Sequence, residues 1–74
     1  MKKVRGIRIT EINDAKHLVA LATQIDGDVI ITKGKYCVDC KSLIGVFALD
    51  LSTGVTIEYP EDVIEFDNFI KKFI

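Results

Sequence analysis

The spacing of apolar residues changes several times along this chain, and these changes limit the folds that it can adopt. Residues 7–10 and 55–59 alternate apolar and polar side chains, which is the period of a strand with one buried face. The β-branched residues 29–32 predict another strand, and residues 36–39 predict its hairpin partner across a glycine turn. The sequence therefore predicts four short strands, the first of which begins near Lys3.

Between these strands, apolar residues recur at helical spacing. The first helix is predicted to bury a face formed by Ala15, Leu18, Val19, Ala22 and Ile25. Ser42 is predicted to be the N-cap of a short, mostly apolar helix over residues 42–49. A last helix is predicted to begin at Pro60, with Glu61 and Asp62 in its first turn. Its buried stripe is predicted to consist of Val63, Phe66, Ile70 and Phe73.

These elements follow one another in the order β-α-β-β-α-β-α. Four short strands with helices between them predict an α+β open-faced sandwich, in which one face of the sheet is buried and the other is wet. With 74 residues the chain is expected to form a single domain, residues 1–74. Since 49% of the residues are hydrophobic, a core can form without disulfides or metals.

Charge and composition argue against several classes of partner. The formal net charge is −1 with acids and bases interspersed, which gives no electrostatic reason to bind nucleic acid or an anionic membrane. No run approaches the roughly 20 apolar residues of a membrane span, and we see no export signal. The two cysteines are therefore expected to be reduced thiols of a cytoplasmic protein.

The segment around Ser42 closely resembles the regulatory-serine segment of the HPr family, the small phosphocarriers of the bacterial sugar phosphotransferase system. It reads Val38-Asp39-Cys40-Lys41-Ser42-Leu43-Ile44-Gly45-Val46. The turn at residues 26–29 is similar to the family's helix-to-strand turn, and its distance from Ser42 fits the family without a net gap. The resemblance implies an HPr-like fold, a four-stranded antiparallel sheet with three helices on one face.

The same resemblance implies a phosphoryl-carrying histidine, in a His-Ala-Arg-Pro motif at the start of the first helix, where helix N–H groups and the arginine stabilise the charge. The matching connection here is Thr10-Glu11-Ile12-Asn13-Asp14-Ala15, without histidine, arginine or proline. An ungapped match places Glu11 at the histidine position, whereas matching the strand phase implies a shorter loop. We expect neither histidine phosphocarrier activity nor an enzyme. Whether the Glu11–Asp14 connection forms a site of its own stays open.

Ser42 and two apolar residues of the short helix are the candidate functional residues. The resemblance implies that a dedicated kinase phosphorylates Ser42, where the helix dipole favours the added charge. A helix cap without modification is the alternative interpretation of the same serine. Leu43 and Phe47 lie four residues apart and share a helix face. At the family's matching positions they would form a patch that docks partner proteins, but the pattern allows a core position equally, because the helix is hydrophobic nearly all round.

His17 is the only histidine of the chain and therefore the alternative phosphoryl acceptor. The helical pattern places it inside the first helix and off the buried stripe. Backbone N–H groups there are already bonded to carbonyls, so they cannot stabilise a phosphoryl group. A surface histidine without a role is the favoured interpretation, and a phosphocarrier that uses His17 is the alternative.

Cys37 and Cys40 form a C-x-x-C motif, which elsewhere indicates redox or metal chemistry. In an extended strand these positions point to opposite faces, with Cα atoms about 10 Å apart, too far for a disulfide. Zinc takes four ligands, and the chain offers two thiols and one distant histidine. Inert thiols are favoured over a thiol or metal module.

Together these features predict a regulatory or docking protein related to the phosphotransferase system and switched at Ser42. No phosphate-binding glycine loop, nucleophile elbow or metal-ligand cluster is present in the sequence, so no cofactor is expected. The expected partners are other proteins, namely enzymes of the phosphotransferase system, a serine kinase or a transcriptional regulator.

Overall fold

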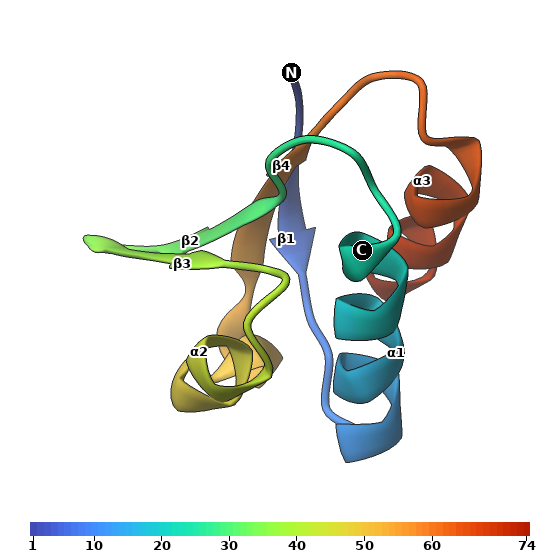
Figure 1. Cartoon of the computed structure of the whole chain (residues 1–74). Coiled ribbons are helices and arrows are strands. Elements are labelled where there is room, and N and C mark those ends of the chain that lie inside the picture. Colours follow the sequence, from blue (N-terminus) through green and yellow to red (C-terminus); the bar gives the residue numbers. More distant parts are fainter.

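The structure of the chain, a computed structural model, describes all 74 residues as a sheet with helices on one face (Figure 1). The elements are β1 (Lys2–Ile7), α1 (Ile12–Thr23), β2 (Ile30–Lys33), β3 (Tyr36–Asp39), α2 (Leu43–Ala48), η1 (Leu51–Thr53), β4 (Val55–Tyr59), α3 (Ile64–Ile70) and η2 (Lys71–Phe73), where η denotes a 3₁₀ helix. The predicted β-α-β-β-α-β-α order is confirmed. None of the helices is long and apolar enough to cross a lipid bilayer.

The four strands form one antiparallel sheet in the order β1-β4-β2-β3. β4 is an interior strand, which pairs with β1 on one side and β2 on the other; Ile57, for example, pairs with both Val4 and Ile31. β3 lies at one edge and pairs only with β2, so that the β2–β3 hairpin projects away from α1 and α3 (Figure 1). The predicted α+β open-faced sandwich is confirmed.

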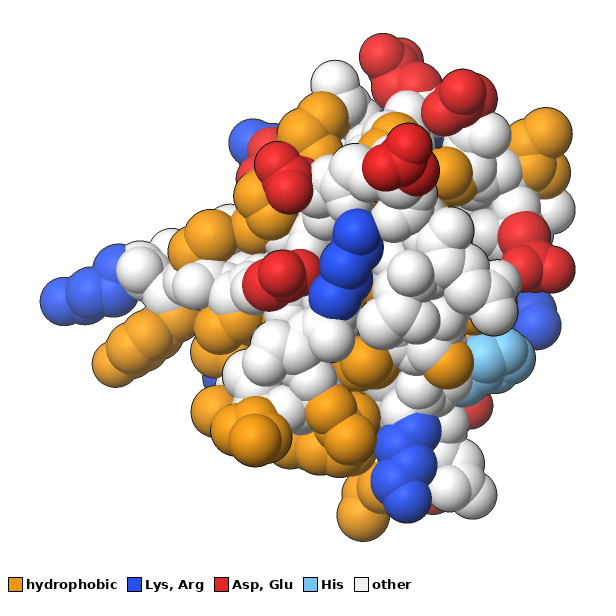
Figure 2. Space-filling view, viewed as in Figure 1, with side chains coloured by type: hydrophobic (Ala, Val, Ile, Leu, Met, Phe, Trp, Pro, Cys, Tyr) orange, Lys and Arg blue, Asp and Glu red, His pale blue; other side chains and the backbone are white.

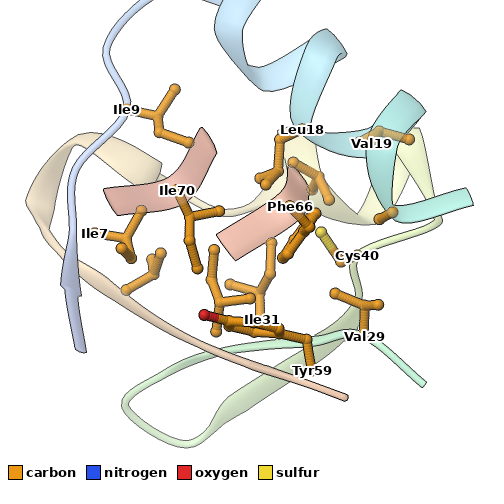
Figure 3. Packing of buried hydrophobic residues seen from close by; sticks show 14 of the residues in the cluster. Ile7, Ile9, Leu18, Val19, Val29, Ile31, Cys40, Tyr59, Phe66 and Ile70 are labelled. Carbon is orange, nitrogen blue, oxygen red and sulfur yellow. The ribbon is translucent and has the colours of Figure 1, made fainter. Parts of the chain in front are cut away.

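The alternation along β4 determines which face of the sheet is covered. Val55, Ile57 and Tyr59 are buried, whereas Thr56 and Glu58 between them are half-buried. In Figure 3, Leu18 of α1 and Phe66 and Ile70 of α3 point from the helices toward the side chains of the sheet. The predicted face of the first helix is confirmed, because all five of its residues, Ala15, Leu18, Val19, Ala22 and Ile25, are buried.

Two predicted boundaries are wrong. The first strand does not run over residues 7–10, because a register shift between Val4 and Ile7 and the positive φ of Gly6, +75°, bend the chain at its end. Ile9 is still buried beyond the strand, and its N–H donates to the Leu51 carbonyl at 2.9 Å. Residue 10 is therefore already part of the connection to α1.

The last helix begins at Ile64, with Val63 at the N-cap position, and not at Pro60. Pro60 directly follows β4, and the chain must cross from the sheet to the helical layer before it can turn into a helix. Pro60 packs there against the turn at Gly27, where an added Cβ would lie 3.3 Å from the proline Cγ. Phe69, which the predicted stripe omitted, is buried, whereas Val63 and Phe73 are only half-buried.

Asp67 connects α3 to the sheet through three partners. Its carboxylate accepts hydrogen bonds from Lys2 Nζ at 2.6 Å, from Lys71 Nζ at 2.8 Å and from the Tyr59 hydroxyl. Hydrogen bonds from Lys2 and then Lys71 hold the pKa of Asp67 far below its usual range. Burial, and then the bond to Asp67, raises the pKa of Tyr59. The ionised carboxylate therefore ties β1, β4 and α3 together.

Because the pKa of Asp67 is lowered in the folded state, Asp67→Asn is expected to destabilise the protein in a pH-dependent way. The stabilisation is fully present above the unfolded-state pKa of about 3.9 and is lost as the pH falls through the folded-state pKa. Thermal unfolding should show a lower midpoint for the variant at pH 7. The gap to the wild type should stay constant down to about pH 5 and narrow below about pH 4.

Asp62→Asn is the matched control, since Asp62 is exposed and forms no ion pair. It is expected to leave the midpoint nearly unchanged. Equal destabilisation by Asp67→Asn at pH 7 and at pH 2 would contradict the role of the ionised carboxylate.

Candidate functional site

A shallow hollow of about 130 Å³ lies where the β1–α1 connection meets α2. Glu11 and Ile12 at the start of α1 line it from one side, and Phe47 of α2 lines it from the other. The fold therefore places the Glu11–Asp14 connection, for which the sequence predicted no definite role, beside Phe47, one of the two predicted docking residues.

At the start of α1, Glu11 occupies the N-cap position with extended backbone angles, φ −97° and ψ 134°. Its carbonyl accepts the N–H of Ala15 at 3.1 Å, and its exposed side chain forms no cap hydrogen bond. Asp14 adds a second carboxylate in the first turn. Ile12 between them is 66% exposed although it belongs to the helix. The helix end where the positive pole of the dipole lies therefore carries two carboxylates and an exposed isoleucine.

Ser42 is the N-cap of α2, as predicted. Its Oγ accepts the N–H of Gly45 at 3.1 Å, and its own N–H donates to the Asp39 carbonyl at 3.0 Å. A Cβ at Gly45 would lie 3.2 Å from the Ser42 Oγ, so the glycine leaves room for the cap. The side chain of Ser42 is exposed. Its phosphorylation stays a prediction.

Leu43 and Phe47 lie on the surface, with 43% and 45% of each residue exposed. The core contact of α2 comes from Val46, which is fully buried, whereas Ile44 is 85% exposed. Figure 2 shows hydrophobic side chains gathered over α2. Of the two alternatives that the sequence left open, the structure favours a surface patch for Leu43 and Phe47.

His17 lies on a different part of the molecule. It is exposed on α1, and its ring packs against Phe69 with 4.6 Å between the ring centroids. The Nζ of Lys72 lies 5.8 Å from the centroid of the same Phe69 ring. Glu65 and Asn68 line the hollow around His17. The structure therefore brings His17 together with α3 and not with Ser42 or Phe47.

Cys37 and Cys40 are both free thiols; Cys37 is exposed and Cys40 is fully buried. Burial, and then the nearby charge of Asp39, raises the pKa of Cys40 to about 12. The thiol of Cys40 therefore stays protonated near neutral pH. Cys37 lies in β3 and Cys40 directly after it, and no cluster of three or more potential metal ligands is formed.

Two exposed isoleucines near this site, Ile12 and Ile44, were not among the candidate residues predicted from the sequence. Ile12 stands between two polar residues before the predicted stripe begins, and this position was the available signal. The sequence contains no signal that Ile44 is exposed, because every face of the short helix is apolar. Only the tertiary structure shows which face of the helix is covered.

Comparison with known proteins identifies a family and a fold. A family model described as the PTS HPr component phosphorylation site matches residues 10–59. HPr-C-His from Thermoanaerobacter tengcongensis is 22% identical, with a TM-score of 0.77 over 100% of this chain and 91% of that chain. The phosphocarrier protein HPr from Bacillus anthracis is 21% identical, with a TM-score of 0.72 over 99% of this chain and 96% of that chain.

The histidine-containing phosphocarrier protein of a Mycoplasma is 20% identical, with a TM-score of 0.75 over 97% of this chain and 90% of that chain. No curated protein sequence matches this chain significantly. At these identities the solved structures show the fold, and the family model, which spans more than half of the residues, shows the family. The chain belongs to the HPr family of the phosphotransferase system.

Proposed function

We propose that this protein is an HPr-family docking and regulatory protein, formed by residues 1–74 as one domain, that does not carry a phosphoryl group on a histidine. The observation that carries the proposal is the start of α1, where Glu11 and Ile12 stand beside α2 and no imidazole is present. The similar proteins from Bacillus anthracis and Mycoplasma are named phosphocarriers, the latter a histidine-containing one.

The electrostatics at this end of α1 support the proposal. A helix N-terminus attracts anions because its first N–H groups are unpaired and the dipole is positive there. Here the carboxylates of Glu11 and Asp14 already bring negative charge to this position. They would repel an incoming phosphoryl group, which is itself anionic.

The placement of His17 also supports the proposal that the protein does not carry a phosphoryl group on a histidine. Its ring lies against Phe69 rather than in a set of hydrogen-bond donors. A phosphoryl group on this ring would sit beside Glu65, which lines the same hollow. Lys72 is the one cation that lines this hollow, and it lies over the Phe69 ring.

We place the regulatory modification at Ser42 and partner docking at Leu43 and Phe47. The Ser42 hydroxyl is exposed and stands at the end of α2 where the dipole favours negative charge. Leu43 directly follows Ser42 and shares a helix face with Phe47, which lines the same hollow as Ile12. We call these three exposed residues, Leu43, Phe47 and Ile12, the docking patch. A phosphate on Ser42 would therefore change which partner can approach the docking patch. The proposed partners are phosphotransferase-system enzymes, a serine kinase or a transcriptional regulator.

The lack of carrier chemistry is tested by the intact mass after incubation with enzyme I and phosphoenolpyruvate. No gain of one phosphoryl group is expected, while an authentic HPr in the same tube is labelled. His17→Ala serves as the second sample. A mass gain in the wild type that disappears in His17→Ala would show a phosphocarrier that uses His17, and would overturn the proposal.

The role of Ser42 is tested with an HPr serine kinase and ATP. The wild type is expected to gain one acid-stable phosphate, which Ser42→Ala abolishes. The same substitution removes the cap of α2 and should lower the free energy of unfolding by about 1 kcal/mol. Ser52→Ala is the matched control, because Ser52 is also exposed but donates its hydroxyl to Asp50 instead of capping α2. Labelling that persists in Ser42→Ala would place the modification elsewhere.

The docking patch is tested in the same kinase reaction. Phe47→Ala is expected to raise KM about tenfold with little change in thermal midpoint, because the side chain is nearly half exposed but suited to a partner contact. Ile64→Ala removes a 74% exposed apolar side chain on α3 and should leave KM unchanged. Equal effects of the two substitutions would show that Phe47 has no special part in docking.

A further inference from the structure

A second apolar groove lies on the other side of α2, between its C-terminal end and the β2–β3 hairpin. Its volume is about 490 Å³. It is lined by Lys33, Tyr36, Val38, Ala48, Leu49 and Asp50. Figure 2 shows hydrophobic side chains along the underside of the projecting hairpin as well as over α2. The groove contains none of the three residues of the docking patch, and it shares only Leu49 and Asp50 with the hollow beside Phe47.

The helical spacing of α2 explains why there are two apolar faces. Leu43 and Phe47 are four residues apart, and Phe47 lines the hollow next to α1. Ile44 and Ala48 are also four residues apart, and Ala48 lines the groove next to the hairpin. Since Val46 alone is fully buried, α2 presents one face to each side.

The groove exposes more apolar surface than the fold requires. Tyr36, which lines the groove, is 65% exposed at the beginning of β3. Ile44 does not line the groove, but it is 85% exposed one helical turn before Ala48, which does. Folding gains nothing from apolar surface that stays in water, and contiguous exposed patches of this kind mark interaction sites. An aromatic residue beside a hydrophobic groove is a frequent anchor point in protein interfaces.

The charges at the rim indicate what the groove would accept. The Nζ of Lys33 donates a hydrogen bond to the Asp50 carbonyl at 3.1 Å, which connects the hairpin to the segment after α2. The other N–H groups of the Lys33 ammonium stay available to a ligand. Lys35 is exposed in the turn of the same hairpin. Asp50 lines the opposite side of the groove, after α2, where its carboxylate accepts hydrogen bonds from the hydroxyl of Ser52 at 2.6 Å and from the Ser52 N–H at 3.1 Å and keeps its negative charge. The hairpin side of the groove is therefore cationic and complements carboxylates.

We propose that this groove binds a segment of another protein that inserts an apolar side chain between Tyr36 and Ala48 and sets acidic side chains against Lys33 and Lys35. The inference goes beyond the proposed function, because it adds a face separate from the docking patch, at which binding requires no phosphate on Ser42. We take this segment to be an acidic amphipathic helix, because the apolar side chains of such a helix recur every three or four residues on one face and can enter an apolar groove.

The test is an NMR titration of the isotope-labelled full chain with two synthetic helical peptides. Both peptides carry two leucines four residues apart; one has glutamates at its other exposed positions and the other has lysines. The acidic peptide is expected to cause saturable shifts of the amides of Tyr36, Val38 and Ala48, which line the groove and not the hollow beside Phe47. The lysine peptide should bind about tenfold or more weakly, because its charge opposes the hairpin.

Two pairs of variants locate the binding. Ala48→Glu should abolish the shifts, whereas Ala20→Glu, the same change at an exposed position of α1, should leave them intact. The double variant Lys33→Glu/Lys35→Glu should weaken binding of the acidic peptide about tenfold, and Lys16→Glu should not. The thermal midpoint of each variant verifies that it is folded.

Several results would overturn the proposal. These are the absence of saturable shifts with the acidic peptide, equal affinity for both peptides, and shifts confined to the docking patch that persist in Ala48→Glu. Shifts of the groove amides that depend on protein concentration alone would show that a second copy of the chain fills the groove, which also overturns it. Because the peptides bypass enzyme I and the kinase, failure here leaves the proposed function standing.

Discussion

The single apolar face of the sheet determines where everything else in this protein lies. β4 is paired on both sides, and its alternate residues Val55, Ile57 and Tyr59 all project to the same face. Burying that face requires every helix to pack there, because the opposite face carries polar side chains such as Glu58 and Thr56. The ends of the helices and the connections between them are then the surfaces that remain for partners.

Among these helices α2 is covered least, and this follows from its length. A helix of six residues cannot be stable alone, so α2 depends on the Ser42 cap and on the burial of Val46. With one anchoring residue, the other apolar side chains of the helix stay at the surface on both sides. The same hydroxyl that stabilises the helix is thus the group proposed for modification, and a change at Ser42 acts directly on the element that displays both apolar faces.

The sequence predicted the features that depend on local pattern. The strands 36–39 and 55–59, the buried face of α1 and the cap at Ser42 all follow from periodicity or from hydrogen-bonding capacity within a few residues. The start of α3 could not be predicted in this way, because Pro60 is a favourable first helical residue by local rules, but there the chain is still crossing between layers. The exposure of Leu43 and Phe47 and the groove beside Tyr36 depend on which face of α2 meets the sheet, which no local signal records.

A phosphate on Ser42 would affect both faces of α2 at once. Ser42 directly precedes Leu43, which belongs to the docking patch, and Ile44, which lies four residues before Ala48 of the hairpin groove. A phosphoserine carries about −1.5 to −2 charges at neutral pH. At the docking patch this charge would add to the carboxylates of Glu11 and Asp14 and favour a partner with basic side chains. At the hairpin groove it would oppose the acidic segment that Lys33 and Lys35 attract. One modification could therefore exchange one class of partner for the other without any rearrangement of the fold.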